Sequence, residues 1–247
     1  MARILMATRD YDKARKLIDD SAADVPKNPD VAMLQGAIAM AQNRPADAVI
    51  AFQRGVSLVD NGVTRARLAA AQMQAGHPDE SEKTLLPWIQ AHPDDGAARF
   101  ALGDAYIATN RMADAEAQYT AILLKNPNDA VAENNLAWAL SQQGQSEEAL
   151  KHVRHAAELA PNSPQVLDTL GIVLLKNGKS DEAVDTLKKA ITLEPNSNAD
   201  IRFHLAQALA GDGKKDQARD TLRNLLDSTP QFKERAQAEK LLQELGS

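Results

Sequence analysis

The run LDTLGIVLLKNGKSDEAVDTLKKAITLEP (residues 167–195) holds Leu, Gly, Ala and Pro at offsets that already occur in the run before it. That earlier run, ENNLAWALSQQGQSEEALKHVRHAAELAP (residues 133–161), has nearly the same plan. Corresponding residues lie 34 positions apart: Leu136 and Leu170, Gly144 and Gly178, Ala149 and Ala183, Pro161 and Pro195. The chain therefore repeats itself with a period of about 34 residues.

The repeat extends through most of the chain, in three columns of residues. A small residue recurs at intervals of 33 to 35 residues, at Ala14, Ala48, Ser81, Ala115, Ala149, Ala183 and Ala218. Twelve residues before each of these stands a second small residue, at Ala2, Gly36, Ala69, Gly103, Ala137, Gly171 and Ala206. Twelve residues after the first column stand Pro26, Asp60, Pro93, Pro127, Pro161, Pro195 and Pro230. A period of this length predicts an array of helical hairpins.

Each column has a physical reason, which the quoted run illustrates. Two helical faces are predicted, one with Leu170, Gly171 and Leu174, the other with Ala183, Leu187 and Ala190. The small residues allow the two helices to approach closely. Gly178 can end the first helix in the left-handed conformation, and Pro195 ends the second. Ser163 can cap the next helix, with Pro164 at its first position.

Composition excludes several classes of protein. The chain has 247 residues, of which 44% are hydrophobic, and it can bury a sizeable core. A net charge of -6, a pI near 5.4 and the lack of a basic stripe argue against a nucleic-acid surface. The absence of cysteine excludes disulfides and thiol catalysis. No apolar run is long enough to span a membrane, and the N-terminus lacks the apolar core of a signal peptide.

The pattern resembles the tetratricopeptide repeat (TPR) family along essentially the whole chain. The resemblance implies an all-α solenoid, a right-handed superhelix of helix hairpins. Its expected units are residues 29–61, 62–95, 96–129, 130–163, 164–198 and 199–232, preceded by a partial unit at 1–28 and followed by a capping helix at 233–247. Unusual residues stand at Gln35, Asp60, Gln72, Ser81 and Trp88, and they predict a weaker joint between repeats near residues 59–62.

The family generally binds other proteins, with its first helices lining a concave groove. By position, the resemblance implies a continuous lining of Met33, Met40, Met73, Phe100, Asp104, Ile107, Asn134, Trp138, Asp168, Ile172, Leu175, Phe203 and Gln207. Several of these columns carry large residues whatever the ligand, so packing is the alternative role. Trp138 and Ile172 stand in a usually polar column and could form an apolar platform for a peptide or helix.

Other functions have little support in the sequence. The carboxylate clamp of chaperone-binding relatives would need Lys, Asn and Arg, but its positions here hold Phe100, Asp104, Asn135, Gln165 and Thr169, of which only Asn135 fits. Glu148, His152 and His155 share a helical face, yet they are expected on the outer side of a second helix, where charged residues are ordinary. No phosphate loop or catalytic triad is present. The sequence therefore predicts no enzyme, cofactor or metal site.

A narrower resemblance lies in NNLAW (134–138), LDTLG (167–171) and IRFHLA (201–206), with FKERAQAEKLLQEL (232–245) after them. These runs are similar to the C-terminal part of PEP-CTERM system TPR-repeat lipoproteins, which are associated with exosortase and exopolysaccharide gene clusters. The resemblance implies an envelope or periplasmic scaffold, here as a fragment without the lipidated cysteine. The alternatives are a cytoplasmic TPR adaptor with an unrelated protein partner, and self-association through terminal repeats.

Overall fold

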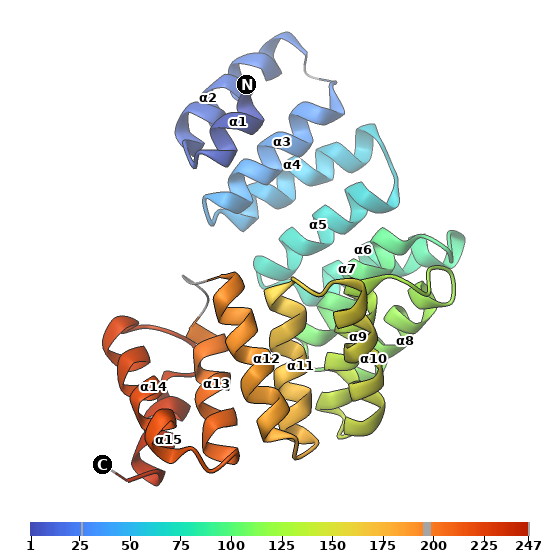
Figure 1. Ribbon diagram of the computed structural model, residues 1–247. Helices are drawn as coiled ribbons and strands as arrows, with labels where there is room; N and C mark the ends of the chain where they lie inside the picture. Colours follow the sequence, from blue (N-terminus) through green and yellow to red (C-terminus); the bar gives the residue numbers. More distant parts are fainter. Residues whose placement is uncertain (26, 195–198, 247) are drawn as a thin grey trace. The chain divides into compact units, whose positions relative to one another are not determined.

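The computed structural model describes residues 1–25, 27–194 and 199–246, and within these ranges it consists of helices joined by short turns (Figure 1). No strand occurs in them, so the all-α expectation is confirmed. Pro26 and Pro195 of the proline column lie outside the described residues. The chain forms two compact units, Met1–Lys125 and Asn126–Ser247.

Unit 1 is built from four antiparallel helix pairs. Its described helices are α1 (Ala2–Ala7), α2 (Tyr11–Asp24), α3 (Pro29–Ala41), α4 (Pro45–Leu58), α5 (Gly62–Gln74), α6 (Pro78–Ala91), α7 (Gly96–Ala108) and α8 (Met112–Leu123). Each odd-numbered helix packs on the helix that comes next in the chain, and α5 also packs on α4 and α7. The odd-numbered helices are thus the first helices of the hairpins, as the period predicts.

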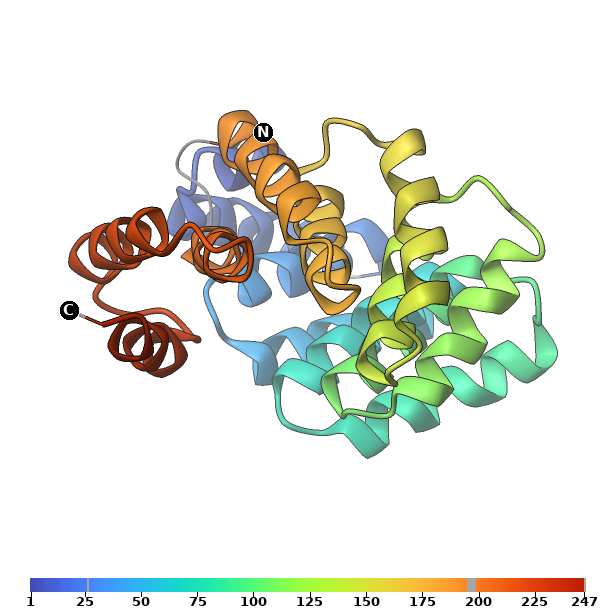
Figure 2. The same ribbon diagram turned by 60° about the horizontal axis from the view of Figure 1, so that its bottom comes forward.

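Unit 2 continues the same plan with three pairs and a terminal helix. Its described helices are α9 (Ala130–Gln142), α10 (Ser146–Leu159), α11 (Pro164–Lys176), α12 (Ser180–Leu193), α13 (Ala199–Gly211), α14 (Lys215–Ser228) and α15 (Arg235–Glu244). Helix α15 packs on α14, and the two lie side by side at the red end of Figures 1 and 2. The helix pairs fall within the unit boundaries expected from the sequence, which remain a prediction.

The turn inside each hairpin contains one residue with a left-handed backbone. Gly178 has φ +72°, as predicted. Its N–H donates to the carbonyl of Leu175 at 3.0 Å, and the N–H of Lys179 donates to the carbonyl of Leu174 at 2.9 Å. These two bonds satisfy carbonyls at the end of α11. The same place in other hairpins is held by Arg9, Asn43, Gly76, Asn110, Gly144 and Gly213.

Side-chain caps begin the first helices. The carboxylate of Asp129 accepts hydrogen bonds from the N–H groups of Val131 and Ala132 at the start of α9. Ser163 accepts one from the N–H of Val166 at 3.4 Å, with Pro164 at the first position of α11, so this prediction is confirmed. Capping of this kind satisfies N–H groups that have no partner inside the helix.

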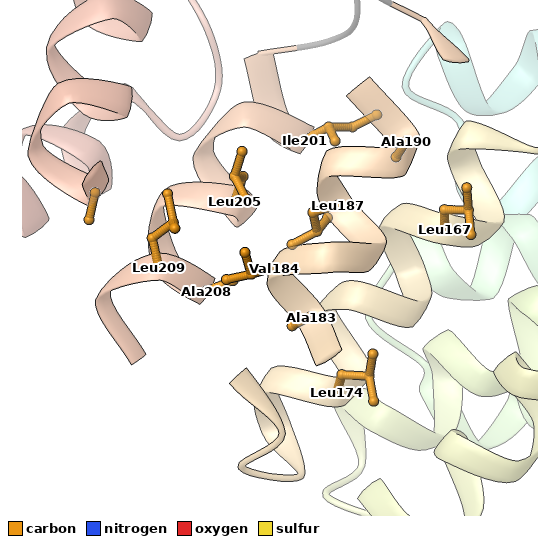
Figure 3. Packing of buried hydrophobic residues seen from close by; sticks show 11 residues of the cluster. Leu167, Leu174, Ala183, Val184, Leu187, Ala190, Ile201, Leu205, Ala208 and Leu209 are labelled. Atoms are coloured by element: carbon orange, nitrogen blue, oxygen red, sulfur yellow. The ribbon is translucent and has the colours of Figure 1, made fainter. Parts of the chain in front are cut away.

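The small residues of the first helices leave room for large side chains from the second helices. A Cβ added at Gly171 would lie 2.5 Å from Cγ of Leu187, and one added at Gly36 would lie 2.4 Å from the ring of Phe52. The same relation joins Gly103 to Tyr119. In unit 2 this packing produces a continuous cluster on α11, α12 and α13, which includes Leu174, Ala183, Leu187, Ala190 and Leu205 (Figure 3).

The joint before α5, where a weaker contact was expected, is held by polar contacts. Asp60, which replaces proline, accepts hydrogen bonds from Nε of Arg65 at 2.6 Å and from its Nη2 at 2.9 Å. The same guanidinium lies 5.2 Å from the centre of the Trp88 ring, and the Trp88 indole N–H donates to Asp95 at 2.8 Å. Because Asp95 also caps α7, these contacts connect α5, α6 and α7. The predicted weakness of this joint stays a prediction.

Candidate protein-binding surface

An open apolar pocket lies between the first helices α5 and α7 of unit 1. Its volume is about 540 Å³. It is lined by Ala66, Ala70, Met73, Gln74, Ala97, Phe100, Ala101, Asp104, Ala105 and Ala108. Most of these residues are alanines, and their short side chains leave the space open between the two helices. We call this cavity the α5–α7 pocket.

The larger side chains at this pocket are held by contacts with the second helix of the same hairpin. The ring of Phe100 lies 6.1 Å from that of Tyr119, centre to centre. Tyr119 is buried, and its hydroxyl donates to the carboxylate of Asp104 at 2.6 Å. Phe100 and Met73 are half-buried, so part of each faces the pocket. The pocket thus combines an apolar lining with one carboxylate, a combination typical of ligand-binding sites.

A second pocket lies on the same first-helix side of unit 1, between α3 and α5. Its volume is about 600 Å³. It is lined by Met6, Pro29, Asp30, Met33, Leu34, Ala37, Val59, Asn61, Val63, Thr64 and Arg67. We call it the α3–α5 pocket. Helix α5 contributes to both pockets and separates them, so the two cavities flank one exposed helix face.

The structure brings together three of the predicted lining residues in unit 1, Met73, Phe100 and Asp104, at the α5–α7 pocket. Met33 is only 7% exposed, and its sulfur fills the space above Gly55, where an added Cβ would lie 2.4 Å away. Met33 therefore packs mainly in the core and also contributes to the lining of the α3–α5 pocket, while its predicted place in a binding groove stays a prediction. Met40 is half-buried and packs on the cluster that contains Met33, and Ile107 is half-buried on α7.

In unit 2 the predicted lining residues have different environments. Asp168 accepts a hydrogen bond from Nδ1 of His204 at 2.7 Å, a contact between α11 and α13. The Asn134 amide donates to Asn135 at 3.1 Å, and the oxygen of the Asn134 amide is buried. Gln207 is exposed. The remaining apolar side chains are half-buried: Trp138, Ile172 and Leu175.

Phe203 is buried in the core of the last repeat. Its side chain is only 3% exposed and belongs to a cluster with Ala206, Leu222, Leu225 and Ala238 of α13, α14 and α15. The resemblance placed Phe203 in the groove lining, whereas in the structure it packs against α14 and α15. The physical reason is that α15 must bury its own apolar face, and Phe203 supplies part of the surface that it covers.

His152 and His155 do not simply face solvent, as the sequence suggested. Both imidazoles donate from Nδ1 to the carboxylate of Glu133, at 2.6 and 2.9 Å. The Glu133 side chain is only 8% exposed. Within the described ranges no group of three or more His, Cys, Asp or Glu side chains is arranged to hold a metal ion. The cluster is therefore a hydrogen-bonded joint between α9 and α10.

Sequence reasoning missed the residues that create the pockets, because they are the least distinctive ones. The alanines of α5 and α7 are ordinary helix formers, and only their exposure in the structure shows that they line a cavity. For α5 the sequence does contain a pattern that indicates a shared helix face. Its positions are spaced by four, three and four residues, at Val63, Arg67, Ala70 and Gln74. Such spacing places four residues on one helix face.

Comparison with known families supports the repeat assignment. Tetratricopeptide repeat models match residues 1–62 and 67–130, residues 119–151, and residues 174–245. One of these models alone matches just over half of the chain. The chain belongs to the tetratricopeptide repeat family. No curated protein sequence matches it.

Solved TPR structures share the fold at low identity. A chain of the APC/C hetero-tetramer Cut9–Hcn1 matches with a TM-score of 0.80 and 16% identity, over 100% of this chain and 48% of that one, so this TPR chain spans about half its length. A tetratricopeptide repeat protein from Parabacteroides merdae matches with a TM-score of 0.73 and 17% identity, over 100% and 96% of the two chains. A thermophilic TPR protein in Thermus thermophilus matches with a TM-score of 0.62 and 20% identity. The match covers 74% of this chain and 100% of that one. At these identities the likeness shows the fold.

The chain belongs to a family whose members are generally non-catalytic scaffolds for protein–protein interaction. Among the described residues, none of the helices is both long and apolar enough to cross a membrane. For a repeat fold the ligand depends on the side chains of the surface and not on the framework.

Proposed function

We propose that this TPR chain binds a segment of a partner protein on the first-helix face of unit 1, in the α5–α7 pocket. The observation that supports the proposal is the apolar lining, which consists mainly of alanines together with Met73 and Phe100. Burying an apolar partner side chain there removes apolar surface from water, which is the main driving force of association. Asp104 adds a polar group to the lining.

The experiment is a capture assay with a variant in which the pocket is filled. Ala70 is exposed on α5, so Ala70→Trp blocks the pocket without changing the core. Ala117 is exposed on α8, away from both pockets, and Ala117→Trp is the matched control. A partner identified by mass spectrometry should bind the parent and the control equally and should bind Ala70→Trp at least about tenfold more weakly. Equal capture by all three chains would exclude the pocket as the binding site.

We propose the bacterial envelope as the setting, with a role in exopolysaccharide export or exosortase-linked sorting. The support is the resemblance of the runs at residues 134–138, 167–171 and 201–206 to PEP-CTERM system TPR-repeat lipoproteins. These runs lie on α9, α11 and α13, the first helices of unit 2. Lipid anchoring of the full protein belongs to the same proposal. Immunodetection in fractionated cells tests it, since a signal confined to the cytosol would leave the cytoplasmic adaptor as the better proposal.

A further inference from the structure

The exposed face of α5 carries one uncompensated positive charge between the two pockets. Arg67 is exposed and lines the α3–α5 pocket. Ala70 is one helical turn further along the same face and lines the α5–α7 pocket. Within residues 1–25, 27–194 and 199–246, Arg67 has no hydrogen-bond or ion-pair partner. A ligand that crosses α5 from one pocket to the other must therefore pass this guanidinium.

The acidic residues that line the pockets are already stabilised by their surroundings. Asp104 accepts the hydrogen bond from Tyr119. Asp30 stands in the first turn of α3, where the helix dipole favours a negative charge. Arg67 lies in the middle part of α5 and has no such compensation. The charge that a ligand can best complement is thus positive, and a carboxylate pairs with a guanidinium through two parallel hydrogen bonds.

The apolar parts of both pockets indicate which ligand residues would flank a carboxylate that pairs with Arg67. On the α3–α5 side, Val63 is 52% exposed and Val59 is 40% exposed, and both face water in the unbound chain. On the α5–α7 side, Met73 and Phe100 are partly exposed above alanines. Isolated exposed apolar residues are common, but here they cluster at two cavities on one face. Each cavity can accept a large apolar side chain.

We propose, on the basis of the proposed function, that the preferred ligand is an extended segment with an Asp or Glu between two large apolar residues. The acidic side chain pairs with Arg67, and the apolar side chains enter the α3–α5 and α5–α7 pockets. Neighbouring helix axes lie about 10 Å apart. An extended chain advances about 3.3 Å per residue, so the two apolar residues stand roughly three or four positions apart.

The test begins with selection from a display library of random twelve-residue peptides on the intact chain. Binding peptides are counter-selected against the Ala70→Trp variant, which fills the α5–α7 pocket. Selected sequences should share an acidic residue between two apolar ones. The quantitative probe is the labelled peptide Gly-Ser-Leu-Ser-Glu-Ser-Phe-Ser-Gly, compared with the same peptide in which Lys replaces Glu, by fluorescence anisotropy.

The charge swap distinguishes recognition by Arg67 from general electrostatics. The parent chain should bind the Glu peptide at least about tenfold more tightly than the Lys peptide, and Arg67→Glu should reverse this order. Lys83 is exposed on α6, outside both pockets, so Lys83→Glu makes the same charge change as a control and should keep the parent's preference. Circular dichroism should show equal helix content in all three chains.

The outcomes separate the two proposals. If selected peptides require an open α5–α7 pocket but Arg67→Glu changes their charge preference less than about twofold, the acidic pattern is wrong and the proposed function stands. If Lys83→Glu acts as strongly as Arg67→Glu, the preference reflects net charge and the inference fails. If no peptide binds the parent better than Ala70→Trp, both proposals fail.

Discussion

The carboxylate of Glu133 on α9 lies 2.6 Å from Nδ1 of His152 on α10. His155, one turn further along, donates to the other carboxylate oxygen at 2.9 Å. A carboxylate that is 8% exposed is stable only if such donors replace the water it has lost. The two imidazoles therefore supply the hydrogen bonds that water would supply to an exposed glutamate.

Glu133→Ala should destabilise unit 2 because it leaves two half-buried imidazoles without their acceptor. We expect a loss of about 1–3 kcal/mol in the free energy of unfolding, measured by urea denaturation with circular dichroism. The control is Glu147→Ala, since Glu147 is exposed on α10 and its removal should change stability by less than about 0.5 kcal/mol. An equal effect of both variants would show that the Glu133 contacts contribute nothing specific.

Gly171→Ala should destabilise the α11–α12 hairpin through a steric conflict. The added methyl carbon would lie 2.5 Å from Cγ of Leu187, which is fully buried in a close-packed core. We expect a loss of about 1–3 kcal/mol in the free energy of unfolding. The measurement is again urea denaturation.

A double-mutant cycle checks the cause of that loss. Leu187→Ala alone should cost about 2–5 kcal/mol because it leaves a cavity. In the double variant the new methyl group occupies part of this cavity, so the combined loss should be smaller than the sum of the two single losses. Simple additivity would mean that the glycine is needed for backbone reasons and not for the room that it leaves to Leu187.

The sequence predicted the helices well because each column has a single dominant physical cause. The small residue at Gly171 and the turn residue at Gly178 are required by close packing and by a left-handed backbone, and both act locally. Phe203 could not be placed in the same way. Its burial comes in part from α15, and a repeat period does not predict how a terminal helix packs on the last repeat.

The pockets illustrate a second limit of prediction from sequence. Met73 and Phe100 were identified from their column, whereas Ala70 and Arg67 were not, although they lie on the same exposed face of α5. A cavity is the absence of side-chain atoms, so the residues that create it are the small ones. Their role becomes visible only when the neighbouring helix is in place.

Ser81→Ala should stabilise unit 1. Ser81 is completely buried in α6, and among the described residues its hydroxyl has no hydrogen-bond partner. The corresponding residues of the other repeats, Ala48 and Ala115 among them, carry no hydroxyl at this position. Removing a buried polar group without a partner should raise the free energy of unfolding by roughly 1 kcal/mol. Thermal unfolding monitored by circular dichroism provides the measurement.

The control for this substitution is a buried serine that does have a partner. Ser141 is 3% exposed, and its hydroxyl donates to the carbonyl of Trp138 at 2.9 Å. Ser141→Ala removes a hydrogen bond together with the hydroxyl, so it should be neutral or destabilising. If both variants raise the melting temperature equally, helix propensity and not the unsatisfied hydroxyl explains the gain.

Glu234, the residue just before α15, should contribute more to stability at acidic pH than at pH 7. Burial, together with a hydrogen bond to Asp200, raises the pKa of Glu234 above its ordinary value of 4.5. The folded protein therefore favours the neutral carboxylic acid. A raised folded pKa gives a contribution to stability that is complete below pH 4.5 and is lost as the pH rises through the folded value.

Glu234→Gln removes this dependence because the amide stays neutral and can donate to Asp200 at any pH. The difference in melting temperature, variant minus parent, should be positive at pH 7 and should shrink toward zero below the ordinary pKa of 4.5. Glu239 is exposed on α15, and Glu239→Gln is the matched control. Since Glu239 pairs only at the surface, with Arg235 at 2.9 Å, its substitution should change stability little at either pH. A difference for Glu234→Gln that stays constant between the two pH values would mean that this carboxyl group titrates alike in the folded and unfolded chains.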